Sequence, residues 1–435
     1  MSTLSPPPPN TRSRTSSLGQ FSLGDTAAPS LSTMEPTLTQ IRGSEKRQRA
    51  LSGAMQPDLS PGSTAAVPLG GEKAVSSTAS TEKTLGTLAW LWMSYSEVSY
   101  RKKWVTPLIL ASIPPIAFAL SSVHDSTNPI WPFLCASYRI EPTEEGGQVM
   151  YGKGPLDFAF VFYYMIVFSF IREFVMQQIL EPIAKMCGLR RGKVKRFMEQ
   201  TYSMVYYGVM SPWGLYIMRH MPLWYFQTRP MYEMYPHKTH ELDFKLYYLL
   251  QAAFWSQQSM ILSLQVEKPR SDFKELVFHH IITIALIFCS YRFHFTWIGI
   301  AVYITMDTSD FVLAMSKTLN YLNYQFIGPF FGFFMVVWIY TRHYLSLRIL
   351  WSVATEFRTV GDFQLNWDTQ QYKCWISQYI TFALLASLQA VNVYWLCLII
   401  RVAYKYVFLK VAKDERSDDE DEEDEVPGEE DKKEK

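Results

Sequence analysis

Two adjacent histidines and two closely spaced aspartates stand inside long apolar runs of the sequence. His279 and His280 lie near the start of the run DFKELVFHHIITIALIFCSY, and Asp307 and Asp310 lie in the next run, WIGIAVYITMDTSDFVLAMSK. Imidazole can act as a nucleophile or a general base near neutral pH, and a carboxylate bonded to its other nitrogen fixes the tautomer. These residue types predict acyl transfer from a thioester to an amine, which requires no metal.

Helical spacing decides which of these side chains share a face. Successive helix positions differ by about 100°, so His279 and His280 point in different directions, one into the reactive cavity and one toward a neighbouring helix. Asp307 and Asp310 are spaced i,i+3, which places both carboxylates on one face. Each costs about 2.5–3.5 kcal/mol inside a bilayer, so the pair indicates function. Antiparallel packing of the two runs would bring all four groups into the cytosolic leaflet.

Two other interpretations of this cluster stay open. The histidines and aspartates could pair only to hold two helices together. They could also bind a metal, as in a lipid oxidase, although adjacent histidines have poor facial geometry and the whole chain holds 8 His. The five cysteines show no CxxC spacing that would indicate zinc.

Composition divides the chain into an apolar centre and two polar ends. The net charge of +1 gives no indication of nucleic-acid binding. Residues 1–84 are rich in Ser, Thr and Pro, and residues 411–435 are mostly charged, so both are expected to be disordered cytosolic tails. Residues 85–103 could form an interfacial amphipathic helix. Residues 104–410 form the expected transmembrane domain.

The apolar runs predict an all-α integral membrane protein with about eight transmembrane helices. Lys and Arg gather in alternate loops, which the positive-inside rule places in the cytosol together with both termini. Loop 219–243, which this topology places in the lumen, also carries basic residues and therefore does not follow the rule. The expected spans are 104–123, kinked by its prolines, then 156–176, 201–218, 244–266, 276–292, 296–315, 326–346 and 375–400.

The region around the four residues closely resembles the Lag motif of ceramide synthases, within the TLC-domain superfamily. The matching segments are DFKELVFHH, MDTSDF and SKTLNYLN. The likeness continues through WIYTRHY, RILWSVATEFR and NWDTQQYKCWIS, which resemble the fungal branch in particular. It covers roughly residues 85–416.

This resemblance implies an enzyme of the endoplasmic reticulum that joins the acyl group of acyl-CoA to the amine of a sphingoid base, without a cofactor. It implies a barrel of six transmembrane helices around a lipid cavity. His279 would be the nucleophile or base, oriented by Asp307, with His280 and Asp310 in support. Many animal members carry a further histidine where this chain has Met306. The alternative is a non-catalytic TLC-type protein that senses lipid or assists membrane insertion.

The resemblance also implies partners. Family members are often dimers with themselves or a paralogue, and fungal members can carry a small single-span accessory subunit. Acyl chain length and the type of sphingoid base stay open at this stage.

Other polar residues of the apolar region carry weaker indications. Arg172 and Glu173 are interpreted as a snorkelling pair, with binding of CoA phosphates as the alternative. Arg342 and His343 are interpreted as interfacial anchors without a catalytic role. Cys135 and Cys374 both fall in expected lumenal loops, where a disulfide is conceivable.

The tails hold candidate regulatory sites. Ser17 and Ser52 each follow an RxRxxS pattern, which suits basophilic kinases, and Ser417 precedes acidic residues, which suits an acidophilic kinase. Lys432 and Lys433 in the terminal KKEK fit a cytosolic retrieval signal, or form part of a plain solvated charge run.

Overall fold

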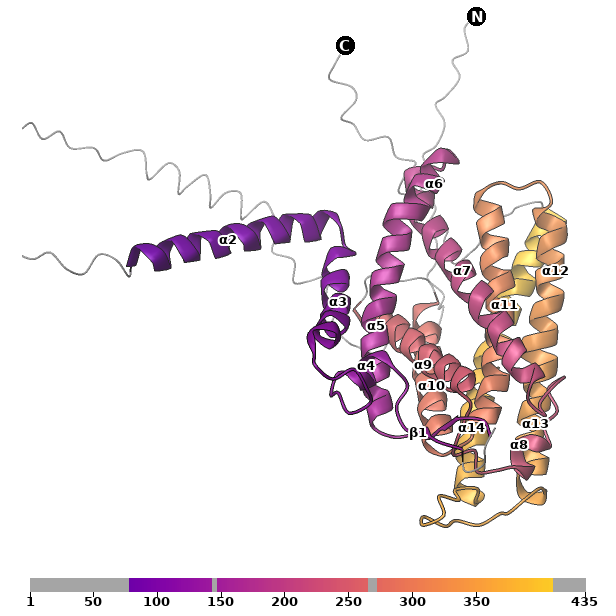
Figure 1. Ribbon diagram of the computed structural model, residues 1–435. Coiled ribbons are helices and arrows are strands. Elements are labelled where there is room, and N and C mark those ends of the chain that lie inside the picture. Colours follow the sequence, from indigo (N-terminus) through magenta and orange to yellow (C-terminus); the bar gives the residue numbers. More distant parts are fainter. Residues whose placement is uncertain (1–77, 143–146, 265–271, 410–435) are drawn as a thin grey trace, which may run out of the picture. The chain divides into compact units, whose positions relative to one another are not determined.

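The computed structural model describes residues 78–142, 147–264 and 272–409, and nearly all of its regular structure is helical (Figure 1). Strands β1 (Arg139–Ile140) and β2 (Met150–Tyr151) pair antiparallel. The helical segments are α2 (Thr78–Arg101), α3 (Val105–Leu120), α4 (Trp131–Leu134), α5 (Leu156–Phe174), η2 (Val175–Leu180), α6 (Glu181–Met186), α7 (Arg191–Arg219), α8 (Pro230–Glu233), α9 (Leu242–Ser263), α10 (Phe273–Arg292), α11 (Thr296–Tyr321), α12 (Ile327–Ile339), η3 (Tyr340–Leu345), α13 (Ser346–Thr359), α14 (Trp375–Tyr404) and η4 (Lys405–Leu409).

Length and hydropathy identify four candidate membrane spans among the described residues: Leu156–Met186, Phe273–Arg292, Thr296–Tyr321 and Trp375–Phe408. The bent pair Ala89–Arg101 and Val105–Leu120 makes a fifth if it is counted as one span. The predicted all-α membrane class is confirmed, while the predicted number of about eight spans exceeds what this test finds. The other expected spans coincide with α7, α9 and the run from α12 to α13. In α9, inward polar residues such as Lys245 and Gln251 lower the hydropathy.

The segment expected to be interfacial is helical and separate from the first apolar helix. The axes of α2 and α3 meet at 112°, so α2 does not continue the direction of α3. The hydroxyls of Tyr95 and Ser99 lie 2.8 and 2.5 Å from the Thr106 hydroxyl and hold this corner together. The break precedes α3, which is one helix with Pro114 and Pro115 inside it, and the expected kink at the prolines stays a prediction.

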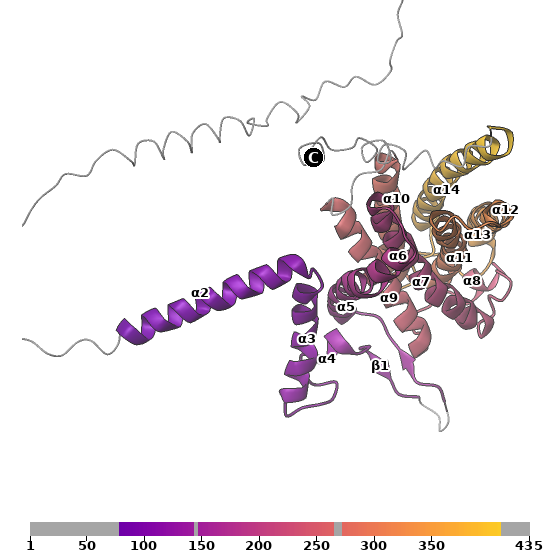
Figure 2. The ribbon, with the colours of Figure 1, turned by 90° about the horizontal axis from the view of Figure 1, so that it is seen from above.

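Six helical segments of the described residues close a ring between Arg191 and Tyr404, when the continuous run α12–η3–α13 is counted as one. α7 packs on α9, α9 on α10, α10 on α14 and α14 on α13, while α12 and η3 return to α11, which packs along α7. Figure 2 shows several of these helices close to end-on. Gly214 of α7 allows the close approach to α11, because a Cβ there would lie 2.9 Å from Cγ1 of Ile304. The ring brings the two predicted motif helices, α10 and α11, into direct contact.

A π-helical turn interrupts the long helical run from α12 to α13. η3 is continuous with both neighbours, and its wider turn shifts the side-chain register by one position. Thr341, Arg342 and Leu345 are buried as a result. Such π-turns in α-helices are frequent at functional sites.

The cysteines are free in the part of the chain that the structure describes. Cys135 follows α4, and Cys374 caps the start of α14, where its side chain accepts from the Ser377 backbone. The conceivable disulfide between them is therefore not formed.

Two histidines outside the spans are buried in the loops beside α10 and α11. His237 stacks on Trp297 with ring centroids 4.0 Å apart, and its Nδ1 lies 3.2 Å from the carbonyl oxygen of His294. Burial lowers the pKa of His237 to about 3, and burial together with the Lys153 ammonium lowers the pKa of His294 to about 4. Both rings are neutral at pH 7.

These lowered pKa values predict a loss of stability in acid. A histidine with a folded pKa below its unfolded value contributes stability above the unfolded pKa, and this contribution is lost as the pH falls toward the folded pKa. We expect the thermal midpoint in detergent to fall between about pH 6.5 and pH 4. The variant His237→Gln should show a shallower pH dependence, and the exposed control His220→Gln should match the wild type. An unchanged slope in His237→Gln would contradict this account.

Candidate active site

Helix α10 carries both predicted histidines at the interior of the ring. His279 is 6% exposed. The two imidazoles stand at right angles with centroids 5.6 Å apart, and each lies edge-on to Trp255 of α9 at 5.8 Å. The two rings are oriented differently, as predicted, but both histidines line the polar cavity described below, so the prediction that only one of them faces the cavity is wrong.

The ring nitrogens of the two histidines have different partners. Nδ1 of His280 lies 2.8 Å from the carbonyl oxygen of Leu276, one turn earlier. A carbonyl only accepts, so Nδ1 carries the hydrogen in this bond and Nε2 presents the lone pair. Nε2 of His279 lies 3.5 Å from the Thr283 hydroxyl, and Nδ1 of His279 is buried without a hydrogen-bond partner among the described residues. His279 therefore keeps a ring nitrogen for a substrate.

Asp307 of α11 is 0% exposed and faces α9. Its Oδ2 accepts from the Tyr247 hydroxyl at 3.4 Å and from the Gln251 amide. The expected hydrogen bond to His279 is not formed. Since α9 supplies two donors at this position, Asp307 anchors α9 to α11 in this structure.

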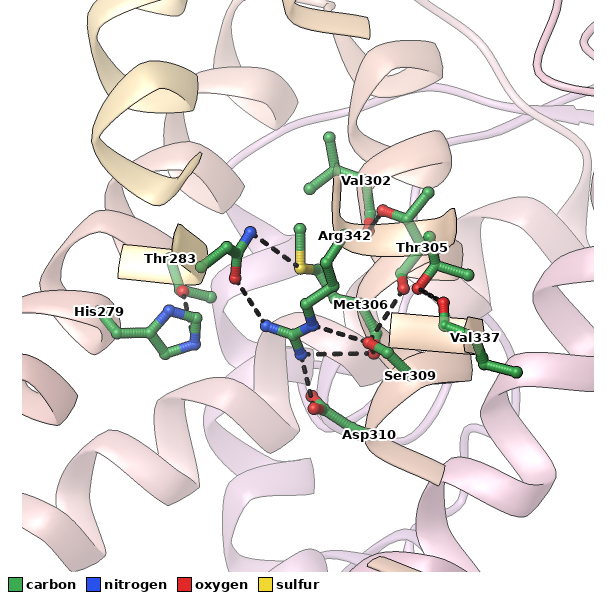
Figure 3. Close-up of polar contacts among 11 residues, drawn as sticks. His279, Thr283, Val302, Thr305, Met306, Ser309, Asp310, Val337 and Arg342 are labelled. Carbon is green, nitrogen blue, oxygen red and sulfur yellow. Dashed lines mark hydrogen bonds and ion pairs between the residues drawn. The ribbon is translucent and has the colours of Figure 1, made fainter. Parts of the chain in front are cut away.

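Asp310 points to a different partner, although it lies one turn from Asp307. Nη2 of Arg342 donates to Oδ1 of Asp310 at 2.5 Å (Figure 3). The Arg342 side chain is 2% exposed and that of Asp310 is 17% exposed. The interpretation of Arg342 as an interfacial anchor is wrong, because the π-turn directs it into the core.

The Arg342 guanidinium is held on several sides. Nε donates to the Ser309 hydroxyl at 2.7 Å, and Nη1 donates to the Asn392 amide oxygen at 2.9 Å. Its carbon lies 4.4 Å from the centroid of the Trp338 ring. Figure 3 shows the Arg342 guanidinium in contact with Ser309 and with Asp310. These contacts fix both the position and the orientation of the charge.

Two hollows meet at these residues. A cavity of about 270 Å³ is almost entirely apolar and is lined by residues such as Leu286, Ile298 and Leu384. A second cavity of about 220 Å³ has a polar lining that includes Arg172, Arg196, Glu199 and Lys317. Four residues line both cavities, namely Trp255, His279, Asp310 and Arg342. His280 lines the polar cavity, and Asp307 lines neither of the two.

The amino-acid sequence of this chain is similar to those of several known proteins. The TLC domain matches residues 196–401, a range that includes all four predicted site residues. Sphingosine N-acyltransferase LAG1 of Saccharomyces cerevisiae is 45% identical over 415 residues, which cover 95% of this chain and 93% of that protein. Sphingosine N-acyltransferase lac1 of Schizosaccharomyces pombe is 48% identical over 326 residues, covering 75% and 83%. Ceramide synthase 4 of Mus musculus is 32% identical over 228 residues, covering 52% and 54%.

The chain belongs to the ceramide synthase family. The recognition based on DFKELVFHH and MDTSDF is thereby confirmed. Met306 stands where the resemblance places a histidine in many animal ceramide synthases. It is buried and lines the apolar cavity, and its Sδ lies 4.0 Å from the Asn392 amide nitrogen. This position therefore contributes apolar surface to the cavity of this ceramide synthase.

Arg172 and Glu173 were interpreted from the sequence as a snorkelling pair; the structure contains this ion pair, but it buries the guanidinium instead of extending it to the surface. Arg172 is 5% exposed, lies 2.6 Å from the Glu173 carboxylate and lines the polar cavity. The alternative interpretation, a contact with phosphates, is compatible with this location. The Arg172 side chain reaches the polar cavity from α5, which lies outside the range matched by the TLC domain.

Sequence analysis missed Arg342, Asn392, Gln251 and Trp255 as components of the site. An arginine and an asparagine inside long apolar runs were available signals, because intramembrane polar groups are functional by default. The regulatory candidates Ser17, Ser52 and Ser417 and the lysines of the terminal KKEK lie outside the described residues.

Proposed function

We propose that this protein is a ceramide synthase of the endoplasmic reticulum that transfers a fatty acyl group from acyl-CoA to the amine of a sphingoid base. The names of its relatives state this class of activity. The observation that carries the proposal is the meeting of an apolar and a polar cavity at His279. A thioester with a hydrocarbon chain on one side and a charged headgroup on the other fits such a junction.

The polar cavity suits the CoA part of the donor. Arg172, Arg196 and Lys317 bring positive charge to its lining, and Glu199 is the acidic residue on the same lining besides Asp310. Phosphate groups are bound by arginine and lysine through charge-assisted hydrogen bonds. The cavity lies near the ends of α5 and α11 and the start of α7, on the side that the basic loops predict to be cytosolic. Acyl-CoA would reach it from the cytosol.

The apolar cavity suits the hydrocarbon chains. Burying a methylene group contributes about 0.8 kcal/mol, so a long acyl chain is held firmly there. With the chain in the apolar cavity and the headgroup in the polar one, the thioester carbonyl would lie beside His279.

His279 has the chemistry for the transfer itself. The acceptor ammonium must lose two protons to become an amide, while the C–S bond breaks and the thiolate leaves. One proton ends on the thiol of CoA and the other is released to water. His279 can accept the proton as the amine attacks directly, or it can attack the thioester first and form an acyl-imidazole that the amine then opens. His280 lines the polar cavity, and its Nε2, which carries the lone pair, can relay the released proton.

Purified protein incubated with acyl-CoA and sphinganine tests this proposal. Mass spectrometry should find the amide in an amount equal to the free thiol released at steady state, and omission of either substrate should abolish amide formation. Lipid binding without amide formation would favour the alternative of a lipid-sensing TLC protein. Stoichiometric iron in the protein would favour a metal-dependent oxidase.

The charge of Lys317 should influence donor binding more than turnover. We expect Lys317→Gln to raise the KM for acyl-CoA about tenfold, equivalent to about 1.4 kcal/mol, with a much smaller change in kcat. Lys185→Gln, on the exposed surface of α6, is the matched control and should leave KM unchanged. A normal KM in Lys317→Gln would place the CoA phosphates elsewhere.

Several further properties complete the proposal. Both termini are expected in the cytosol, and the family suggests a dimer and a small single-span accessory subunit. Ser17, Ser52 and Ser417 stay candidate phosphorylation sites.

A further inference from the structure

The carboxylate that faces the apolar and polar cavities belongs to Asp310 and not to Asp307. Asp310 lines both cavities and its side chain is 17% exposed, whereas Asp307 is fully buried and bonded to α9. Among the described residues that line the apolar cavity, Asp310 is the one carboxylate. Its Oδ1 accepts from Arg342, which leaves Oδ2 for another cation.

We infer that Arg342 is a positioning residue that orients Asp310 to bind the ammonium group of the acceptor lipid beside His279. This inference rests on the proposed function, because it concerns the acceptor of the same reaction. An ammonium group entering an apolar cavity requires an anion, since an unpaired charge in a medium of low dielectric is costly. Asp310 can supply this anion, because its side chain lines both cavities.

Arg342 suits this role because its own position is fixed independently of Asp310. Ser309, Asn392 and the Trp338 ring hold three sides of the guanidinium. The planar group therefore has one direction left in which Nη2 meets Oδ1 of Asp310. Without it, the carboxylate would rotate freely about its side-chain torsions, and its distance from His279 would no longer be set.

The ion pair also keeps the empty site stable in the membrane. The Asp310 charge is compensated by Arg342 before the acceptor arrives, so the cavity never holds a lone anion. Binding of the ammonium then makes a three-member cluster, from which His279 can remove a proton. The amide product is neutral and loses the attraction to Asp310, which favours its release.

Separate Michaelis constants for the two substrates test the inference in the full-length protein. In Arg342→Gln and in Asp310→Asn we expect the KM for sphinganine to rise about tenfold or more, with the KM for acyl-CoA within about twofold of the wild type. Asp310→Asn/Arg342→Gln should be no worse than either single variant, because both act on one interaction. Arg342→Lys should restore part of the loss. Arg348→Gln, an exposed arginine of α13, is the control.

Equal changes in both KM values, a fall in kcat alone, or additive losses in the double variant would overturn the inference. Arg342→Gln leaves an uncompensated buried carboxylate and could prevent folding, but the double variant removes both charges. Ser309→Ala, which removes one guanidinium contact, gives a second test and should raise the sphinganine KM by a smaller factor. A wild-type protein that makes no amide would instead refute the proposed function itself.

Discussion

His279→Ala is expected to lower the rate of amide formation by about 10²–10⁴, the contribution of a positioned acid–base group. The physical reason is the location of the imidazole, which lies on both cavities and keeps Nδ1 without a hydrogen-bond partner among the described residues. The loss should appear in kcat measured on purified protein with saturating acyl-CoA and sphinganine. Expression and thermal stability should change little, because the side chain borders open space.

His220→Ala is the matched control for this variant. His220 lies just after α7 and is exposed, and its Nδ1 contacts the carbonyl oxygen of Tyr216, four residues earlier. Its replacement should leave the rate unchanged. Retention of more than a few per cent of activity in His279→Ala would assign the chemistry to another group, with His280 as the first candidate.

Lys245→Met is expected to destabilise the protein by about 3–5 kcal/mol, the cost of breaking a buried ion pair by removing one partner. Nζ of Lys245 lies 2.8 Å from Oδ1 of Asp157, and the side chains are 0% and 4% exposed. Nζ also donates to the carbonyl oxygens of Ser137 and Gly152 at 2.8 Å. The lysine thus ties the loop before α5 to α9, and its loss leaves the Asp157 charge without this cation.

Thermal unfolding in detergent measures this effect. Lys238→Met, at an exposed loop position, should leave the midpoint unchanged. Asp157→Asn/Lys245→Met should recover part of the loss, because no buried charge is left without a partner. If Lys245→Met and Lys238→Met behaved alike, the buried pair would contribute nothing measurable.

Much of the fold and the pairing of the motif helices could be predicted from the sequence. Length and hydropathy located α5, α10, α11 and α14, because a span needs a long apolar run whatever its neighbours are. The 100° step between successive helix positions predicted that the His279 and His280 rings are oriented differently. Their depth relative to Asp307 and Asp310 followed from the residue counts to the flanking charges.

The partners of each polar group could not be predicted in the same way. An i,i+3 spacing places Asp307 and Asp310 on one face, but that face borders α9 on one side and η3 on the other, so the two carboxylates bind different groups. Arg342 was assigned to the wrong environment because a π-turn shifts its register, and nothing local in YTRHYL indicates such a turn. The hydrogen-bond partners of these side chains therefore depend on how the helices pack, which helical periodicity does not specify.

The central claim is that the donor thioester lies at His279, with its acyl chain in the apolar cavity and its CoA in the polar one. The most direct test is an experimental structure of the protein with an acyl-CoA analogue in which a thioether replaces the reactive thioester. The account predicts a hydrocarbon chain among Leu286, Ile298 and Leu384, phosphates near Arg196 and Lys317, and the linking sulfur within reach of the His279 ring. A chain bound outside the helical ring, with the apolar cavity empty, would contradict it.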